Sequence, residues 1–177
     1  MSIFDHCKCV ESVLDAGIDC YMSEGTKEAL ALQHRRIRII RDRERFVIDK
    51  TFSVLPFNVI HDAAEPMGFI IKADNDRLLF VTDTSHIKQR FACPFNIIGI
   101  CCNYDADTLQ KRVESGDINE TYAKRLLTSH MERRVTKAYI RDCCDLSKCT
   151  EIYLLHMSDS NADSERIRKE FEDGFFV

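Results

Sequence analysis

The stretch LFVTDTSH, residues 79–86, decides the fold, because an apolar run typical of a β-strand ends in it on an aspartate, Asp83. Two other apolar runs end on a polar side chain in the same way: one precedes His61 and one precedes His156. The ends of strands are positions at which a rigid sheet presents side chains for binding or catalysis. We therefore expect His61, Asp83 and His156 to point toward one place.

Apolar and helical periodicities outside these runs predict an alternation of elements. We expect strands at residues 19–22, 37–40, 45–48, 52–59, 67–73, 77–82, 96–102 and 151–155. We expect helices at residues 6–15, 27–33, 105–115, 119–129, 133–144 and 163–171. The runs between residues 36 and 59 are interpreted as a meander. Interleaved strands and helices predict an α/β architecture in one domain.

The composition is that of an ordinary globular protein. The chain has 177 residues, 45% of them apolar and 31% charged. Its formal charge of −4 gives no general attraction to nucleic acid or to anionic lipid. There is no run of 18 apolar residues and no pattern of a signal peptide, so we expect a cytoplasmic protein that does not span a membrane.

Nine cysteines are an odd number and their spacing forms no disulfide framework, so free thiols are expected. Cys101 and Cys102 end an apolar run and are interpreted as strand core. Cys143, Cys144 and Cys149 are interpreted as small buried residues. The alternative is a thiolate metal site, but they lack the paired C-x-x-C spacing of such sites.

Histidine nitrogens and carboxylate oxygens are the ligands that zinc takes in proteins. His61, Asp83 and His156, with Asp5 and His6 near the start of the chain, supply that set. Each of them alone has an ordinary interpretation as a surface histidine or as an aspartate in a turn.

The motifs that contain these residues resemble, in order, those of the metallo-β-lactamase-fold hydrolases, in particular the phosphodiesterase-like and nuclease-like branch. Asp5-His6-Cys7-Lys8 resembles the second half of the family's H-x-H-x-D-H motif. Residues 61–69 resemble the loop of the third histidine ligand, residues 80–86 the strand that ends on the bridging aspartate, and residues 155–158 the last histidine. The resemblance implies a metallo-β-lactamase-like αβ/βα sandwich and a metal site made by Asp5, His6, Asp83 and His156. It also implies that His130 contacts a scissile phosphate; the alternative is a polar residue at a helix start.

The sequence departs from the family motif at its beginning. Met1 and Ile3 stand where the two histidines of H-x-H belong, and neither side chain replaces an imidazole. The resemblance then leaves His61 as the remaining ligand of the first site, and implies that the first strands of the sandwich are absent. One zinc ion is expected rather than two. Four ligands around one zinc would close its coordination, which is typical of a structural site.

The first functional hypothesis is therefore a non-catalytic, zinc-binding remnant of a hydrolase that acts as a protein-binding module. Absent strands expose apolar surface, so a homodimer or a protein partner is expected. A phage-type inhibitor of a host nucleic-acid enzyme, similar to an anti-CRISPR protein, is a narrower form of this hypothesis. The alternative is a metal-dependent phosphodiesterase with a reduced or dimer-completed site, in which His130 contacts phosphate. A third interpretation is that the natural start lies upstream of Met1.

Overall fold

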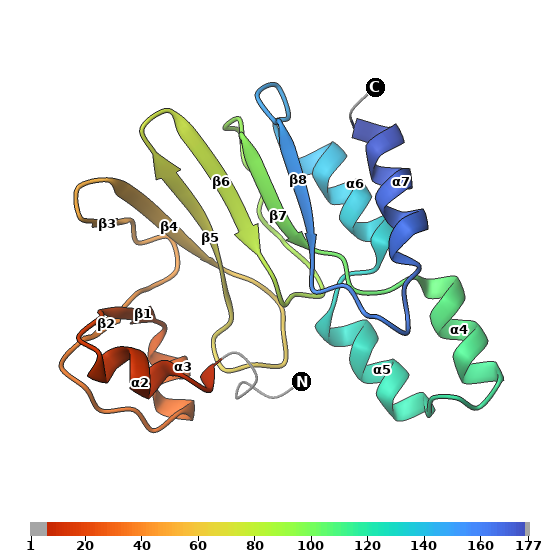
Figure 1. Cartoon of the computed structure of the whole chain (residues 1–177), viewed down its shortest axis with the longest axis horizontal. Helices are drawn as coiled ribbons and strands as arrows, with labels where there is room; N and C mark the ends of the chain where they lie inside the picture. The colour runs from red at the N-terminus through yellow and green to blue at the C-terminus, as the bar shows by residue number, and fades with distance from the viewer. Residues whose placement is uncertain (1–6, 176–177) are drawn as a thin grey trace.

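A six-stranded sheet forms the centre of the molecule in the computed structural model, which describes residues 7–175 (Figure 1). The strands are adjacent in the order β3-β4-β5-β6-β7-β8. Their bounds are Phe46–Ile48, Phe52–Asn58, Met67–Ala73, Asp76–Val81, Ile97–Cys101 and Glu151–Leu155. The predicted α/β architecture is confirmed.

The directions of the strands decide where the sheet presents its polar residues. β4, β5 and β6 are antiparallel neighbours, whereas β6, β7 and β8 are parallel. β4 consequently runs in the same direction as β6, β7 and β8. The carboxyl ends of these four strands therefore lie at one edge of the sheet, the lower edge in Figure 1.

One face of the sheet is buried by helices α6 (Arg133–Cys143) and α7 (Ser164–Phe175). Leu79 pairs with Ile98 on this face, and both are fully buried. Ile140 of α6 and Ile167 of α7 are also fully buried and belong to the same apolar cluster. Burying such side chains is the largest favourable contribution to folding.

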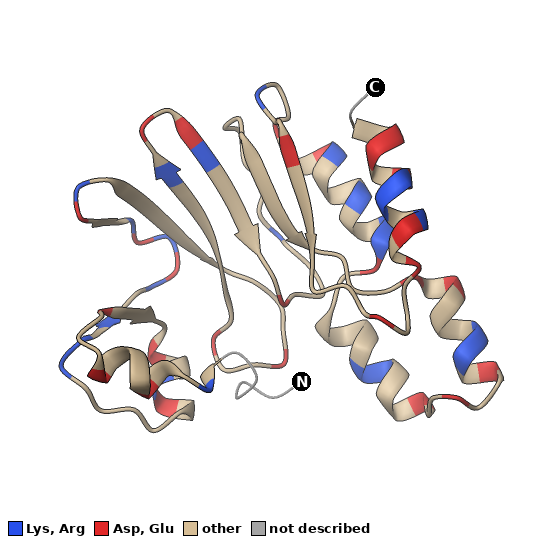
Figure 2. Ribbon diagram, viewed as in Figure 1, with Lys and Arg blue, Asp and Glu red and all other residues tan. Residues whose placement is uncertain are grey.

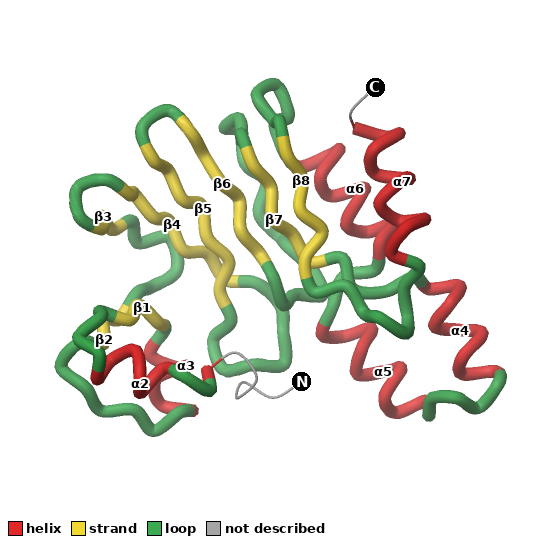
Figure 3. The backbone as a smooth tube through the Cα atoms, viewed as in Figure 1, coloured by secondary structure: helices red, strands yellow, loops and turns green. Residues whose placement is uncertain are grey.

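The opposite face of the sheet is only partly covered. Phe69, Phe80, Gly99 and Tyr153 form one row across β5, β6, β7 and β8. Phe80 is 37% exposed and Tyr153 is 53% exposed. Figure 3 shows α6 and α7 beside β8, at the right of the sheet. Aromatic side chains in a row on an open sheet face are apolar surface that another layer could cover.

The N-terminal elements form a separate small layer below β3–β5 in Figure 1. They are α2 (Val10–Asp15), β1 (Cys20–Met22), α3 (Glu24–Ala29) and β2 (Ile37–Ile39). β2 pairs in parallel with β1 in a two-stranded sheet of its own, so the predicted meander between residues 36 and 59 is wrong for its first strand. Helix α3 begins earlier than predicted because the Ser23 hydroxyl accepts a hydrogen bond from the Thr26 N–H and caps it.

Helices α4 (Ala106–Glu114) and α5 (Glu120–Ser129) form a hairpin that extends from the carboxyl edge of the sheet (Figure 1). Figure 2 shows both acidic and basic residues on α4, α5 and α7 and mainly basic residues on α6, as expected for solvated helix faces. Across residues 7–175, no helix is both long and apolar enough to cross a membrane.

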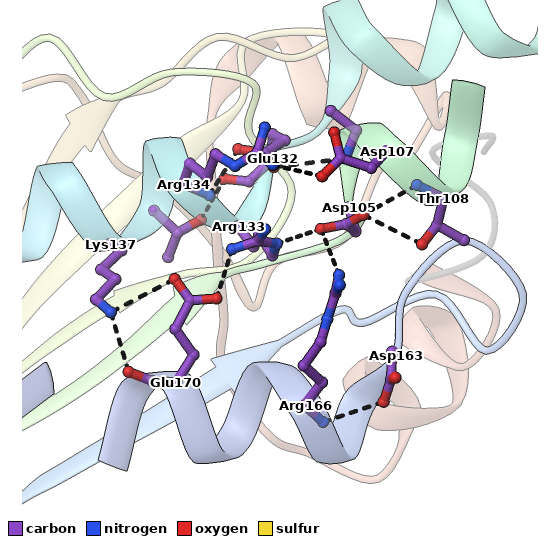
Figure 4. A network of polar contacts seen from close by, with 12 residues as sticks. Asp105, Asp107, Thr108, Glu132, Arg133, Arg134, Lys137, Asp163, Arg166 and Glu170 are labelled. Carbon is purple, nitrogen blue, oxygen red and sulfur yellow. Dashed lines mark hydrogen bonds and ion pairs between the residues drawn. The ribbon is translucent and has the colours of Figure 1, made fainter. Parts of the chain in front are cut away.

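A buried ionic network joins α4, α6 and α7 (Figure 4). Asp105, the N-cap of α4, is fully buried and accepts hydrogen bonds from the Thr108 N–H and from Arg133 of α6. Arg166 of α7 also lies 2.8 Å from the same carboxylate. Arg133 in turn donates a hydrogen bond to Glu170 of α7. The network thus ties all three helices to the segment that follows β7.

All nine cysteines are free thiols, as predicted. Cys101 and Cys102 are fully buried, which confirms that they belong to the core.

Candidate metal centre

The polar residues predicted at strand ends do converge. His61 follows β4, Asp83 follows β6 and His156 follows β8, at the shared carboxyl edge of the sheet. His130 joins them from the end of α5, where it is the C-terminal cap residue. Its ring stacks on that of His156, with the centroids 4.7 Å apart.

Asp83 is the centre of this cluster. One oxygen, Oδ2, lies 3.9 Å from His61 Nε2, and the other, Oδ1, lies 4.0 Å from His130 Nδ1 and 3.0 Å from His156 Nε2. His61, Asp83 and His130 each offer a ligand atom, and these three atoms lie within 4.8 Å of one another. Ligands about 2.0 Å from a tetrahedral zinc are about 3.3 Å apart, so small side-chain movements would bring the three atoms to that spacing.

The local backbone holds Asp83 against the end of β4. The fully buried Thr84 hydroxyl accepts hydrogen bonds from the N–H groups of Ile60 and His86, at 3.3 and 3.2 Å. The Ser85 N–H donates to the Ile60 carbonyl at 2.7 Å. These bonds join the loop after β6 to the segment before His61, which fixes the distance between the two residues.

His156 stands in a left-handed backbone conformation, with φ 60°. That conformation is uncommon for a residue other than glycine and is found disproportionately at functional sites. The Asn103 side chain, which follows β7, stabilises it by donating a hydrogen bond from Nδ2 to the His156 carbonyl at 2.5 Å.

Asn103 also influences where the His156 ring carries its proton. Its Nδ2 lies 2.8 Å from His156 Nδ1. Since Nδ2 is a donor, this contact favours the tautomer in which Nδ1 accepts and Nε2–H donates to Asp83. A metal bound at Nε2 would require the proton on Nδ1 instead.

Burial keeps two of the histidines in the form that binds metals. Desolvation, together with the neighbouring His156, lowers the pKa of His130 to about 4. Desolvation also lowers the pKa of His61, although Asp62 and Asp83 oppose the shift. The pKa of His156 is raised, because its hydrogen bond to Asp83 outweighs its burial. His61 and His130 are therefore neutral imidazoles at neutral pH.

A second layer of charge supports His61. Asp62 Oδ1 lies 2.6 Å from His61 Nδ1, a close polar contact without the alignment of a hydrogen bond. Arg125 of α5 donates from Nε to the other Asp62 oxygen at 2.8 Å. A carboxylate behind a histidine is typical of metal sites, where it orients the ring and raises its basicity.

The cluster separates two cavities. His61 and Asp83 line one of 620 Å³, which extends under the N-terminal layer and is mostly apolar. His130 and His156 line another of 470 Å³, between α5 and the loop after β8. A ligand at the cluster would therefore have space on both sides.

The structure places the predicted site residues as follows. His61, Asp83 and His156 lie together, and His130 lies among them rather than beyond them. Asp5 and His6 fall outside the described residues. Of residues 7–175, His61, Asp83 and His130 form the one group arranged to hold a metal ion, so the thiolate alternative at Cys143, Cys144 and Cys149 is not supported.

Asn103 was missed by the sequence interpretation. The signal was present, because Asn103 follows the apolar run 96–102 as Asp83 follows its own run. An amide at a strand end is simply less conspicuous than a carboxylate or an imidazole.

Comparison with known proteins shows similarity in structure alone. The sequence matches no family profile and no curated protein. The structure is similar to the metallo-β-lactamase fold protein YhfI from Bacillus subtilis, with a TM-score of 0.70 and 14% identity, over 97% of this chain and 68% of that protein.

Two further solved structures have a similar fold. Igni18, a metallo hydrolase from Ignicoccus hospitalis, gives a TM-score of 0.65 at 12% identity, over 97% of this chain and 69% of that one. Zn²⁺-bound PqqB from Methylobacterium extorquens gives 0.63 at 14% identity, over 88% of this chain and 60% of that one. The chain therefore has the metallo-β-lactamase fold, as predicted, and spans about two thirds of the length of these proteins.

Proposed function

We propose that this protein binds a divalent metal ion, zinc in the first place, at the His61, Asp83 and His130 cluster. The observation that carries the proposal is the convergence of three donor atoms within 4.8 Å at the carboxyl edge of the sheet. The residues fit the ion in two respects. Their nitrogen and oxygen donors are those that zinc takes, and the buried His130 Nδ1 has no hydrogen-bond partner among the described residues.

The sequence offers further candidate ligands for the metal ion. His156 is a fourth candidate, if its proton shifts to Nδ1, and Asp5 and His6 are candidates outside the described residues. With one ion, three side chains leave a coordination position open, whereas four close the site. We favour three ligands, because the Asn103 contact holds His156 in the tautomer whose Nε2–H donates a hydrogen bond to Asp83.

We infer from the open position that the protein is a metal-dependent hydrolase of phosphoesters, because its motifs resemble those of phosphodiesterase-like hydrolases. A metal ion at such a site supplies a water molecule of lowered pKa. The protein supplies the rest: the Asp62 carboxylate orients His61, the Thr84 bonds fix Asp83, and the two cavities accept the groups on either side of the scissile bond.

Metal content and turnover test this proposal together. The protein as purified and after dialysis against zinc should contain close to one ion per chain, and Asp83→Ala should remove it. His86→Ala is the matched control, because His86 is an exposed histidine close in sequence that belongs to neither cavity. Hydrolysis of bis(p-nitrophenyl) phosphate should require the ion and should be lost with Asp83→Ala. Protein that retains no zinc after dialysis against the ion would overturn the proposal.

A second candidate function is a non-catalytic, protein-binding module. The half-exposed row of Phe80 and Tyr153 on the uncovered sheet face favours it, because a homodimer or a partner protein could cover that surface. An inhibitor of a nucleic-acid enzyme is the narrower form. Zinc binding without turnover, together with a self-associated state in light scattering that Tyr153→Asp converts to monomer, would support this candidate over the hydrolase.

The cytoplasm is the proposed location for either function. All nine cysteines are free, and free thiols persist in a reducing compartment.

A further inference from the structure

The 470 Å³ cavity beside His130 and His156 contains features that the metal site does not explain. It lies between α5 and the loops that follow β7 and β8. Its lining includes Asn103, Tyr122, Arg125, Ser129, Met157 and Ser158. We call it the Asn103 pocket.

Two side chains that line this pocket keep buried polar atoms without a hydrogen-bond partner among residues 7–175. They are Asn103, 4% exposed, through Oδ1, and Ser129, 1% exposed, through Oγ. Buried polar atoms in folded proteins almost always have a partner, so a pair of exceptions in one cavity calls for an explanation. Neither atom is needed to hold a metal ion.

The orientation of the Asn103 amide is fixed by its neighbour. The His156 carbonyl can only accept, and it receives the hydrogen bond from Asn103 Nδ2. A flipped amide would place two acceptors against each other. Oδ1 is therefore the atom left for a ligand, and it is an acceptor.

That acceptor selects the chemistry of the ligand. The oxygens of a phosphodiester carry no proton at neutral pH, so they cannot donate to Asn103 Oδ1. A hydroxyl group can donate to it, and a hydroxyl can also pair with Ser129 Oγ, which both donates and accepts. The pocket is thus suited to the alcohol portion of a phosphoester rather than to its phosphate.

The remaining lining residues suit an aromatic, ring-bearing alcohol. Tyr122 lines the pocket and is 48% exposed, so its aromatic ring is available for a base to stack on. Leu126 and Met157 add apolar surface. Volumes of about 300–1,000 Å³ are typical of small-molecule sites, and this pocket lies within that range.

We propose that the Asn103 pocket binds the ribonucleoside portion of the substrate, with Asn103 Oδ1 and Ser129 Oγ pairing with sugar hydroxyls and Tyr122 stacking on the base. This proposal rests on the proposed function, because it assigns the substrate class of the same hydrolase. It assigns Ser129 and Asn103 as specificity-determining residues.

Ser129→Ala is the sharpest test, since it removes a hydroxyl that has no partner among residues 7–175 and should leave the fold and the metal content intact. The probe is adenosine 5′-monophosphate, whose dissociation constant is measured by calorimetry on the zinc-loaded protein. One lost hydrogen bond should weaken binding about 3- to 10-fold. The control is Ser147→Ala, an exposed serine outside the pocket, which should leave the dissociation constant unchanged.

A second probe, 2′,3′-dideoxyadenosine 5′-monophosphate, lacks the sugar hydroxyls. Wild-type protein should bind it more weakly than adenosine 5′-monophosphate, and the difference between the two probes should be smaller for Ser129→Ala, which keeps only the Asn103 contact. Turnover of bis(p-nitrophenyl) phosphate should not change with Ser147→Ala.

The outcomes separate the two proposals. Absence of bound zinc in wild-type protein would overturn the proposed function. Normal zinc content and turnover, with no binding of adenosine 5′-monophosphate or with equal binding by wild type and Ser129→Ala, would overturn the pocket assignment alone.

Discussion

At the scale of single residues, the site depends on contacts behind the metal-binding atoms. His61 has Asp62 and Arg125 behind it, Asp83 has the buried Thr84 beside it, and His156 has Asn103. Each supporting group orients a side chain that would otherwise rotate or titrate. Removal of the Asp62 carboxylate or of the Thr84 hydroxyl should therefore weaken metal binding without removing a ligand.

The first prediction concerns Asp62. Asp62→Ala should weaken zinc binding about 10-fold or more, as is typical when the carboxylate behind a ligand histidine is lost. Competition with a chromogenic chelator measures the affinity. Asp173→Ala, on the exposed face of α7, serves as the control. Equal affinities for the two variants would show that Asp62 does not support His61.

The second prediction concerns Thr84. Thr84→Val keeps the shape of the side chain but leaves the Ile60 and His86 N–H groups without the hydroxyl that accepts from them. Buried groups left without a partner cost about 1–3 kcal/mol each. We expect the free energy of unfolding in urea to fall by about that amount, together with a weaker affinity for zinc. Thr128→Val, exposed at the end of α5, should change neither quantity much.

At the scale of elements, the helices are held to the sheet by charge as well as by apolar packing. Burial alone would raise the pKa of Asp105, but hydrogen bonds from Arg133 and Thr108 hold it well below its usual value. A carboxyl whose pKa is lower in the folded than in the unfolded state stabilises the fold above the unfolded value, which is about 3.9. That stabilisation is lost as the pH falls below about 4.

The third prediction follows from the lowered pKa of Asp105. Asp105→Asn should lower the free energy of unfolding at pH 7 by about 3–5 kcal/mol. This is the range for removing one partner of a buried ion pair. The difference between wild type and variant should shrink as the pH falls below about 4. Asp107→Asn is the matched control on the same helix, because Asp107 pairs with Arg134 at the surface and should cost about 1 kcal/mol or less. Urea unfolding from pH 7 to pH 3 measures both.

Most elements could be predicted from local pattern. The strand at residues 151–155 has the predicted bounds, and the predicted hairpin of β5 and β6 turns at Asp74, which has φ 50°. The pairing of β1 with β2 could not be predicted, because a parallel pairing leaves no local trace in either strand. The same reason applies to His130: periodicity placed it at a helix end, but its position against Asp83 depends on how α5 docks on the sheet.

At the scale of the whole molecule, zinc should act as part of the fold. The residues of the cluster are distant in the chain, and they come together only in the native state. Binding to the folded state alone stabilises it by about 2.7 kcal/mol when the free ion is at 100 times its dissociation constant.

The fourth prediction is the thermal counterpart. Removal of zinc with a chelator should lower the melting temperature by roughly 5–10 °C for a chain of this size. Asp83→Ala should melt at the same temperature with and without chelator, whereas His86→Ala should respond as wild type does. Differential scanning calorimetry with matched chelator and zinc samples measures this. An identical melting temperature for wild type in both conditions would contradict the prediction.

The topology of the sheet has a consequence for biosynthesis. His61 and Asp83 leave the ribosome early, but α5 must dock and β8, the last strand, must add to the sheet edge before His130 and His156 can reach them. Domains fold as units as the nascent chain emerges, and long-range pairings form late. The ion should therefore bind only at a late step of folding, after synthesis of β8. Partly synthesised chains should not bind metal through this cluster.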